Sequence, residues 1–218
     1  MKKLLGFIIV FLLCTQAMQA QDPPFYGEIQ AFKKQDSAQM PPKSAILFVG
    51  SSSFNYWKDV QQYFPNHTII NRGFGGSSLP DVIRYANDII FPYQPKQVVI
   101  YCGENDIATQ NATPEQVLER LKTLVDMIRG KFNNIPIAFV SIKPSPSRAH
   151  LMPVMVAANR MIKEYLATLS NTVFIDVYSK MLTDEGKPNP EIFTDDNLHM
   201  NVKGYAIWKQ AIEPYLMK

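Results

Sequence analysis

With 218 residues, the chain is long enough for one α/β domain with a sizeable core and too short for two ordinary domains. Hydrophobic residues make up 46% and charged residues 19%, a balance typical of a globular protein rather than a disordered one. The formal net charge is only +3, and no basic run is interleaved with aromatic residues, so the composition argues against nucleic acid as a partner.

The first twenty residues are predicted to be a signal peptide rather than part of the fold. Lys2 and Lys3 form a positively charged start, residues 4–13 are apolar and uncharged, and Ala17 and Ala20 are small residues suited to cleavage near position 20. The apolar run is too short for a comfortable transmembrane helix. We therefore expect an exported protein, periplasmic or secreted, without a membrane span.

The two cysteines bear on this prediction. Cys14 follows Leu13, whereas lipidation requires a small residue before the cysteine, so a lipoprotein anchor is not favoured. Removal of the leader would leave Cys102 as the remaining cysteine, and no intrachain disulfide could form. It would also leave 20 basic residues (22 − 2) against 19 acidic ones. The fold must then be stabilised by its core.

The rest of the chain alternates apolar runs of strand length with helical patterns. Residues 21–44 are expected to form an N-terminal arm with one short helix around residues 26–33, and residues 45–218 to form the domain. Continuous apolar runs predict five strands of a parallel sheet buried on both faces, over residues 45–50, 67–73, 97–103, 136–142 and 172–177. Apolar residues at helical spacing predict helices over residues 79–91, 113–128, 151–169 and 202–216. This alternation predicts an α/β fold with helices on both faces of the sheet.

Four polar or glycine-rich clusters follow these elements. They are Gly-Ser-Ser-Ser at 50–53, Asn-Arg-Gly-Phe-Gly-Gly at 71–76, Gly-Glu-Asn-Asp at 103–106 and Asp-Asp-Asn-Leu-His at 195–199. Each cluster alone is ordinarily a turn or a helix cap. Three of them, however, end predicted strands, and the carboxyl ends of parallel strands are where ligands bind in such sheets.

Together the clusters contain the groups that acyl transfer needs: a hydroxyl nucleophile, a base, a group that orients the base, and donors for the oxyanion. A serine at a tight strand-to-helix turn presents its hydroxyl above the sheet. A glycine N–H and an asparagine amide are suitable oxyanion donors. A carboxylate three residues before a histidine can accept the imidazole N–H and fix the tautomer that accepts a proton from serine.

The order Ser, Gly, Asn and His, with Asp three residues before the His, resembles the signature blocks of the SGNH (GDSL-like) hydrolases. The resemblance runs from about residue 46 to the C-terminus and implies a flavodoxin-like three-layer α/β/α fold that uses no metal or other cofactor. It implies Ser52 as nucleophile with Asp196 and His199 as its partners. By position it also implies an oxyanion hole made of the Ser52 N–H, the Gly76 N–H and the Asn105 amide.

Two positions depart from the pattern of this family. Its Gly-Asp-Ser block is Gly50-Ser51-Ser52 here, so Ser51 replaces an acidic residue and, with Ser53, flanks the expected nucleophile. Ser52 is still the serine that lies two residues beyond the glycine, as the block requires. Glu104 stands where small residues are common, and it is expected either to orient a substrate hydroxyl or to face solvent.

Other functions fit the sequence less well. Ser78 replaces the third glycine of a dinucleotide-binding motif, and Phe54 replaces the second glycine of an α/β-hydrolase nucleophile elbow. His67, His150 and His199 are too scattered for a hydrolytic metal site. A catalytically inactive binding protein of the same fold would be expected to lack a catalytic position, and none is missing.

The substrate is the least determined feature. The resemblance and the lack of a long apolar lid favour a short-acyl ester on a small molecule or a glycan, with a lysophospholipid or an acyl thioester as the alternative. Trp57 and Phe74 are expected either to wall the acyl or sugar pocket or to pack in the core. The proline-rich residues 143–147 form either a rim of the site or a plain connection. The oligomeric state is left open.

Overall fold

The computed structural model describes residues 22–218, so the predicted signal peptide and Cys14 lie outside the described residues. Five parallel strands form one sheet in the order β2-β1-β3-β4-β5. The strands are β1 (Ile46–Gly50), β2 (Ile69–Gly73), β3 (Gln97–Tyr101), β4 (Ile137–Val140) and β5 (Thr172–Ile175). All five lie within the ranges that the apolar runs predict, and all five are parallel, as predicted.

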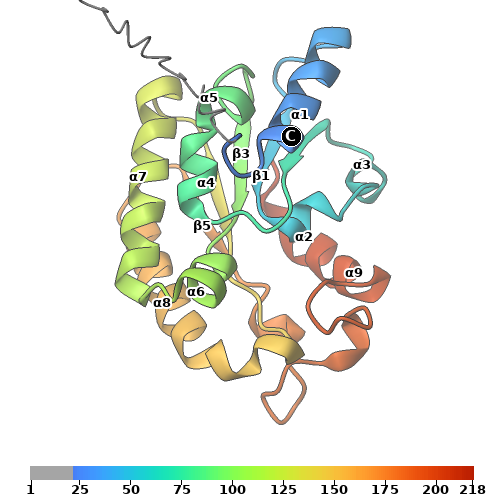
Figure 1. Cartoon of the computed structure of the whole chain (residues 1–218), viewed down its shortest axis with the longest axis vertical. Helices are drawn as coiled ribbons and strands as arrows, with labels where there is room; N and C mark the ends of the chain where they lie inside the picture. The colour runs from blue at the N-terminus through green and yellow to red at the C-terminus, as the bar shows by residue number, and fades with distance from the viewer. Residues whose placement is uncertain (1–21) are drawn as a thin grey trace, which may run out of the picture.

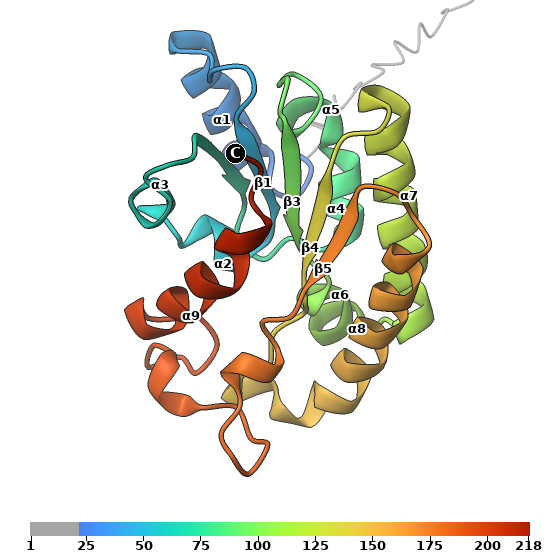
Figure 2. The same ribbon diagram turned by 180° about the vertical axis from the view of Figure 1, so that it is seen from behind.

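Helices cover both faces of the sheet (Figures 1 and 2). The helices that contribute to the apolar cluster on one face are α1 (Tyr26–Ala38), α4 (Leu79–Arg84), α5 (Ala86–Ile89), α7 (Pro114–Phe132) and α8 (Met152–Ala167). Those on the other face are α2 (Ser52–Asn55), α3 (Val60–Tyr63) and α9 (Val202–Ile212). The short helix α6 (Glu104–Gln110) follows β3 and also contributes to the first cluster, through Ile107. The predicted three-layer α/β/α fold is confirmed.

Two predicted helices differ in detail. The expected helix over residues 79–91 is divided at Tyr85, whose backbone is not helical, into α4 and α5. The one expected over residues 202–216 ends at Ile212 and continues as a 3-10 turn, Glu213–Tyr215, because Pro214 cannot continue the α-helical hydrogen bonding. Helix α7 begins as expected, with a capping box between Thr113 and Gln116.

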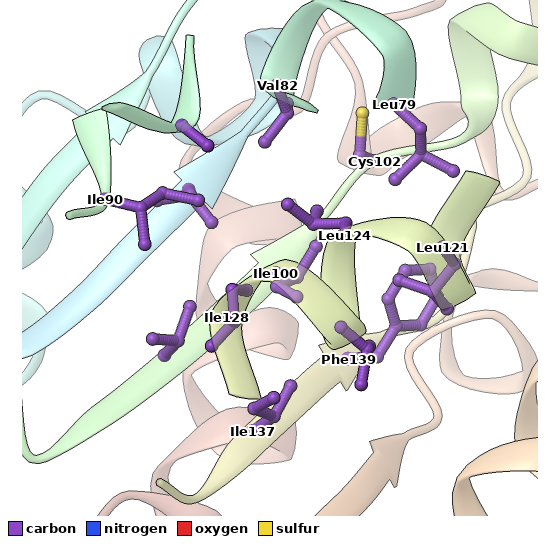
Figure 3. Packing of buried hydrophobic residues seen from close by; sticks show 14 of the residues in the cluster. Leu79, Val82, Ile90, Ile100, Cys102, Leu121, Leu124, Ile128, Ile137 and Phe139 are labelled. Carbon is purple, nitrogen blue, oxygen red and sulfur yellow. The ribbon is translucent and has the colours of Figure 1, made fainter. Parts of the chain in front are cut away.

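The core consists of two apolar layers, one on each face of the sheet. Successive residues of β1 contribute to opposite layers, Leu47 and Val49 to one and Ile46 and Phe48 to the other, which is why the strand is continuously apolar. Figure 3 shows part of the first layer, in which strand residues pack against α7. The labelled side chains include Ile100, Ile137 and Phe139 from the strands and Leu121, Leu124 and Ile128 from α7. Full burial of such a side chain contributes about 1.5–3 kcal/mol, so these layers hold the strand ends in place.

Helix α1 is longer than the helix expected around residues 26–33, and it packs against the domain. Ile29 is only 1% exposed and belongs to the first apolar layer. Asp36 forms an ion pair with Arg72 of β2 and accepts a hydrogen bond from the Tyr93 hydroxyl. Among the described helices, none is long and apolar enough to cross a membrane.

Candidate active site

Three of the four clusters lie at or directly after the carboxyl ends of strands, at one end of the sheet, and the helices that follow β1 and β3 start there (Figure 1). The turn after β1 requires glycine. Gly50 has φ +137°, and a Cβ at this position would lie 1.8 Å from the Tyr101 carbonyl oxygen. The neighbouring Ser51 N–H donates to the same carbonyl over 3.0 Å. The chain can therefore turn sharply into α2 with Ser52 as its first residue.

Ser52 faces a histidine that lies 147 residues later in the chain. The Ser52 Oγ is 3.1 Å from His199 Nε2, and His199 Nδ1 is 2.5 Å from Asp196 Oδ2. Ser52 is half-buried, whereas Ser51 and Ser53 are buried and neither hydroxyl contacts the histidine. The structure thus brings Ser52, His199 and Asp196 together in the expected order.

The loop before α9 folds around the Asp196 carboxylate. Its Oδ1 accepts hydrogen bonds from the backbone N–H groups of Leu198 and His199, both at 2.9 Å, and from the Thr194 hydroxyl at 2.8 Å. Partial burial raises the pKa of Asp196, but the hydrogen bonds from His199, Leu198 and Thr194 outweigh it and hold this pKa well below its usual range. The ionised Asp196 accepts the Nδ1–H of His199, which leaves Nε2 as the proton acceptor beside Ser52.

The Asn105 side chain lies between the Ser51-Ser52 turn and the loop after β2, residues 74–77, which is called the glycine loop below. Its Nδ2 donates to Ser51 Oγ over 2.8 Å and to the Ser77 carbonyl over 3.0 Å. Ser51 directly precedes Ser52, and Ser77 directly follows Gly76, so one amide joins the segments that carry the two expected backbone donors. Its Oδ1 accepts a hydrogen bond from Arg148.

The glycine loop is fixed from both sides. On the side of the sheet, the Phe74 N–H and the Ser77 hydroxyl donate to the Gly50 carbonyl, at 2.9 and 3.1 Å. On the outer side, the Gly75 N–H donates to Glu28 Oε1 of α1 over 3.1 Å. Gly76 is exposed, has φ +76°, and makes no backbone hydrogen bond to another described residue.

Glu104 takes neither of the two roles that the sequence suggests for it. It is 4% exposed, accepts a hydrogen bond from the Tyr101 hydroxyl over 2.6 Å, and forms ion pairs with Lys143 and Arg148, both at 3.0 Å. Burial raises the pKa of Glu104, but Lys143 and Arg148 together lower it below its usual value, so the group is a carboxylate. A buried carboxylate needs such partners, and they come from a segment some forty residues later that no local motif connects to Glu104.

The two aromatic residues considered for the pocket wall are core residues. Trp57 is buried and stacks on Tyr205, with ring centroids 4.8 Å apart, and Phe74 is buried against Phe25. The aromatic residue at the site is instead Tyr56, which sequence reasoning missed. Its side chain is 55% exposed, and its ring centroid lies 4.5 Å from that of His199.

Residues 143–148, called segment 143–148 below, also belong to the site. Lys143 Nζ donates to the Leu198 carbonyl over 2.9 Å, and the Ser147 N–H donates to the Asn197 carbonyl over 3.1 Å. It therefore contacts the loop that carries His199, as a rim would. In residues 22–218, no three His, Cys, Asp or Glu side chains gather as a metal site would require.

Comparison with known proteins gives a family for this arrangement. The model of the GDSL-like Lipase/Acylhydrolase family matches residues 45–207. No curated protein sequence matches the chain significantly.

Solved structures share the fold at low sequence identity. A Bacteroides fragilis protein assigned as an acylhydrolase is 22% identical, with a TM-score of 0.75 over 87% of this chain and 96% of that one. A GDSL-like lipase from Bacteroides thetaiotaomicron is 19% identical, with a TM-score of 0.73 over 86% of this chain and 96% of that one. A catalytic mutant of an acetylxylan esterase from Geobacillus stearothermophilus is 17% identical, with a TM-score of 0.63 over 80% of this chain and 95% of that one. The family match covers most of the chain, and the protein therefore belongs to the GDSL-like lipase/acylhydrolase family of ester-hydrolysing enzymes.

Proposed function

We propose that the protein is an exported serine esterase with Ser52 as nucleophile, His199 as general base and Asp196 as the group that orients the base. The observation that carries this proposal is the continuous contact from Ser52 Oγ through the two imidazole nitrogens to the Asp196 carboxylate, at 3.1 and 2.5 Å. Nucleophile, base and orienting carboxylate within hydrogen-bond reach are the arrangement that activates a serine. An inactive binding protein would have no need for this contact.

The reaction follows from this geometry. As Ser52 Oγ attacks the acyl carbonyl carbon, His199 Nε2 takes the hydroxyl proton, and the carbonyl oxygen becomes an oxyanion. The imidazolium then gives its proton to the departing alcohol oxygen, leaving an acyl-enzyme. Water attacks the acyl-enzyme with His199 again as base, and the carboxylic acid leaves. Asp196 stays ionised and stabilises the imidazolium.

The oxyanion is assigned to the Ser52 N–H, the Gly76 N–H and the Asn105 amide. In the resting enzyme, the Asn105 hydrogens face Ser51 Oγ and the Ser77 carbonyl. An oxyanion formed on the carbonyl that Ser52 attacks competes with the neutral Ser51 hydroxyl for one of these hydrogens. A charged acceptor forms a hydrogen bond roughly twice as strong as a neutral one, so the amide changes partner as the charge develops. This is an interaction stronger in the transition state than before it.

The proposed substrate is a short-acyl ester of a carbohydrate. Because His199 protonates the departing alcohol, that alcohol must lie beside the imidazole, where the exposed ring of Tyr56 is found. An exposed aromatic face suits the apolar face of a sugar ring. The acetylxylan esterase of similar fold acts on an ester of this kind. Hydrolysis of a lysophospholipid or an acyl thioester is the alternative within the same fold.

Export is proposed from the sequence of residues 1–20. Expression of the full chain in a Gram-negative host, followed by fractionation, should give a periplasmic protein whose mass corresponds to cleavage near Ala20. A full-length cytoplasmic product would contradict export.

Purified enzyme tests the activity and its substrate class together. The wild-type protein should release acetate from acetylated xylo-oligosaccharides and hydrolyse nitrophenyl acetate and butyrate at least as well as the decanoate. Ser52→Ala is the inactive control. A clear preference for C10–C12 esters would favour the lipase-like alternative, and no hydrolysis of any ester or thioester would contradict the proposed function.

A further inference from the structure

Segment 143–148 touches both halves of the site. Towards the base, Lys143 and Ser147 hold the carbonyls of Leu198 and Asn197. Towards the oxyanion side, Arg148 reaches back to α6, the helix that carries Glu104 and Asn105. The family motif includes none of the cations in this segment, so their presence needs an explanation of its own.

Arg148 bridges two adjacent side chains. One terminal nitrogen, Nη1, donates to Glu104 Oε1 over 3.0 Å, and the other, Nη2, donates to Asn105 Oδ1 over 3.1 Å. The Arg148 side chain is 17% exposed, and that of Glu104 is buried. A planar guanidinium makes both contacts at once from two separate nitrogens with fixed N–H directions, whereas a lysine ammonium would have one nitrogen for both acceptors.

This bridge and the Ser77 carbonyl together determine which way the Asn105 amide points. A guanidinium has only donors, so it can face the amide oxygen but not the amide nitrogen. Nδ2 is thereby directed towards Ser51 and Ser77, the neighbours of the nucleophile and of Gly76. A flipped amide would place its N–H groups against the Arg148 donors and its oxygen against the Ser77 carbonyl.

The need to neutralise the buried Glu104 carboxylate does not by itself explain why an arginine is present at position 148. Lys143 is buried and lies 3.0 Å from the same carboxylate, so one carboxylate faces two cations. Of the two cations, Arg148 is the one that also contacts Asn105, so its positive charge lies beside the amide where the reaction develops a negative one. A charge-assisted hydrogen bond to Oδ1 also polarises the amide and makes its N–H groups better donors.

We propose that Arg148, held in place by Glu104, is a positioning residue of the oxyanion hole that orients and polarises the Asn105 amide. This inference rests on the proposed function, because it takes Asn105 to be an oxyanion donor. It adds a residue from outside the signature blocks and assigns a role to the buried Glu104, which holds the Arg148 guanidinium in place.

The kinetic test compares Arg148→Met and Arg148→Lys with Arg129→Met. Arg129 bonds carbonyls at the opposite end of the sheet, including those of Ile135 and Ser170, so its loss affects stability without reaching the site. Arg148→Met should lower kcat about 10-fold with KM little changed, a smaller loss than the roughly 10²–10³ expected for deleting the donor itself. Arg148→Lys should restore part of that loss. Arg129→Met should keep the wild-type kcat.

A double-mutant cycle separates positioning from direct substrate binding. If Arg148 acts through Asn105, then Arg148→Met should cause no further loss of kcat in an Asn105→Ala background. An additive loss, a loss confined to KM, or a wild-type kcat in Arg148→Met would each overturn the proposal. If Arg148→Met does not fold, Arg148→Lys gives the same cycle.

A second measurement does not depend on catalysis. The side-chain amide signals of Asn105, identified by their absence in Asn105→Ala, can be followed by NMR. Arg148→Met should shift these signals and speed their exchange with solvent, while Arg129→Met should leave them in place. Unchanged signals in an active enzyme would overturn the role of Arg148 alone. A wild-type protein that hydrolyses no ester would overturn the proposed function and the role of Arg148 with it.

Discussion

The hydroxyl of Ser51 accepts a hydrogen bond from the Asn105 amide over 2.8 Å, across 54 positions of the chain. The serine that replaces the acidic residue of the Gly-Asp-Ser block therefore faces Asn105 and not His199. Because Ser51 is buried and its neighbour Ser52 faces His199, two adjacent hydroxyls have separate partners. This division of roles underlies the following predictions.

Replacement of Asn105 by Ala should lower kcat by roughly 10²–10³ with little change in KM, as expected when an oxyanion donor is lost. Steady-state kinetics and a thermal melting curve on the same preparation provide the check. If Asn105 only closed the turn after β3, the variant would melt at a lower temperature with its kcat nearly intact, and that result would remove it from the oxyanion hole.

Replacement of His199 by Ala should reduce kcat by about three or more orders of magnitude, as deletion of a triad base does. A variant that kept the wild-type kcat would count against His199 as the general base.

The lowered pKa of Asp196 predicts a pH-dependent contribution to stability. A carboxyl whose pKa is lower in the folded than in the unfolded state stabilises the fold above the unfolded value, about 3.9, and this contribution disappears as the pH falls through the folded value. The melting temperature of the wild type should therefore exceed that of Asp196→Asn above about pH 4, and the difference should shrink at lower pH. The difference should be modest because the carboxylate is about half exposed, and a difference that widened below pH 4 would contradict the assignment.

Replacement of Tyr56 by Ala should raise KM for acetylated xylo-oligosaccharides several-fold and leave the hydrolysis of methyl acetate nearly unchanged. In the proposed mechanism the departing alcohol lies beside the imidazole and therefore beside Tyr56, and methanol is too small to stack on its ring. Tyr215→Ala is a matched control, since this exposed tyrosine adjoins the start of β3, at the other end of the sheet. Equal effects on both esters would remove Tyr56 from the alcohol site.

The parts of the fold that follow from local physics could be predicted from the sequence. Continuous apolar runs identify buried parallel strands, and Gly50 marks a turn where no other residue fits. The contact between Ser52 and His199 could be inferred because both residues lie in recognisable blocks at the end of the sheet where ligands bind.

Other features depend on contacts between distant segments and have no local signal. Glu104 could not be placed because its partners, Lys143 and Arg148, belong to a different loop. Tyr56 and Trp57 are adjacent aromatic residues directly after helix α2, and only packing decides that Tyr56 is exposed and Trp57 buried. The contact between Glu28 and the glycine loop likewise depends on how α1 docks.

The most direct test of the proposed triad is the labelling of its nucleophile. A fluorophosphonate probe should modify the wild-type protein, and peptide mass spectrometry should find the adduct on Ser52. Ser52→Ala should abolish labelling, while Ser51→Ala and Ser53→Ala, which alter the buried neighbours, should keep it. Undiminished labelling of Ser52→Ala, or an adduct on Ser51 or Ser53 in the wild type, would contradict the assignment of Ser52 as the nucleophile.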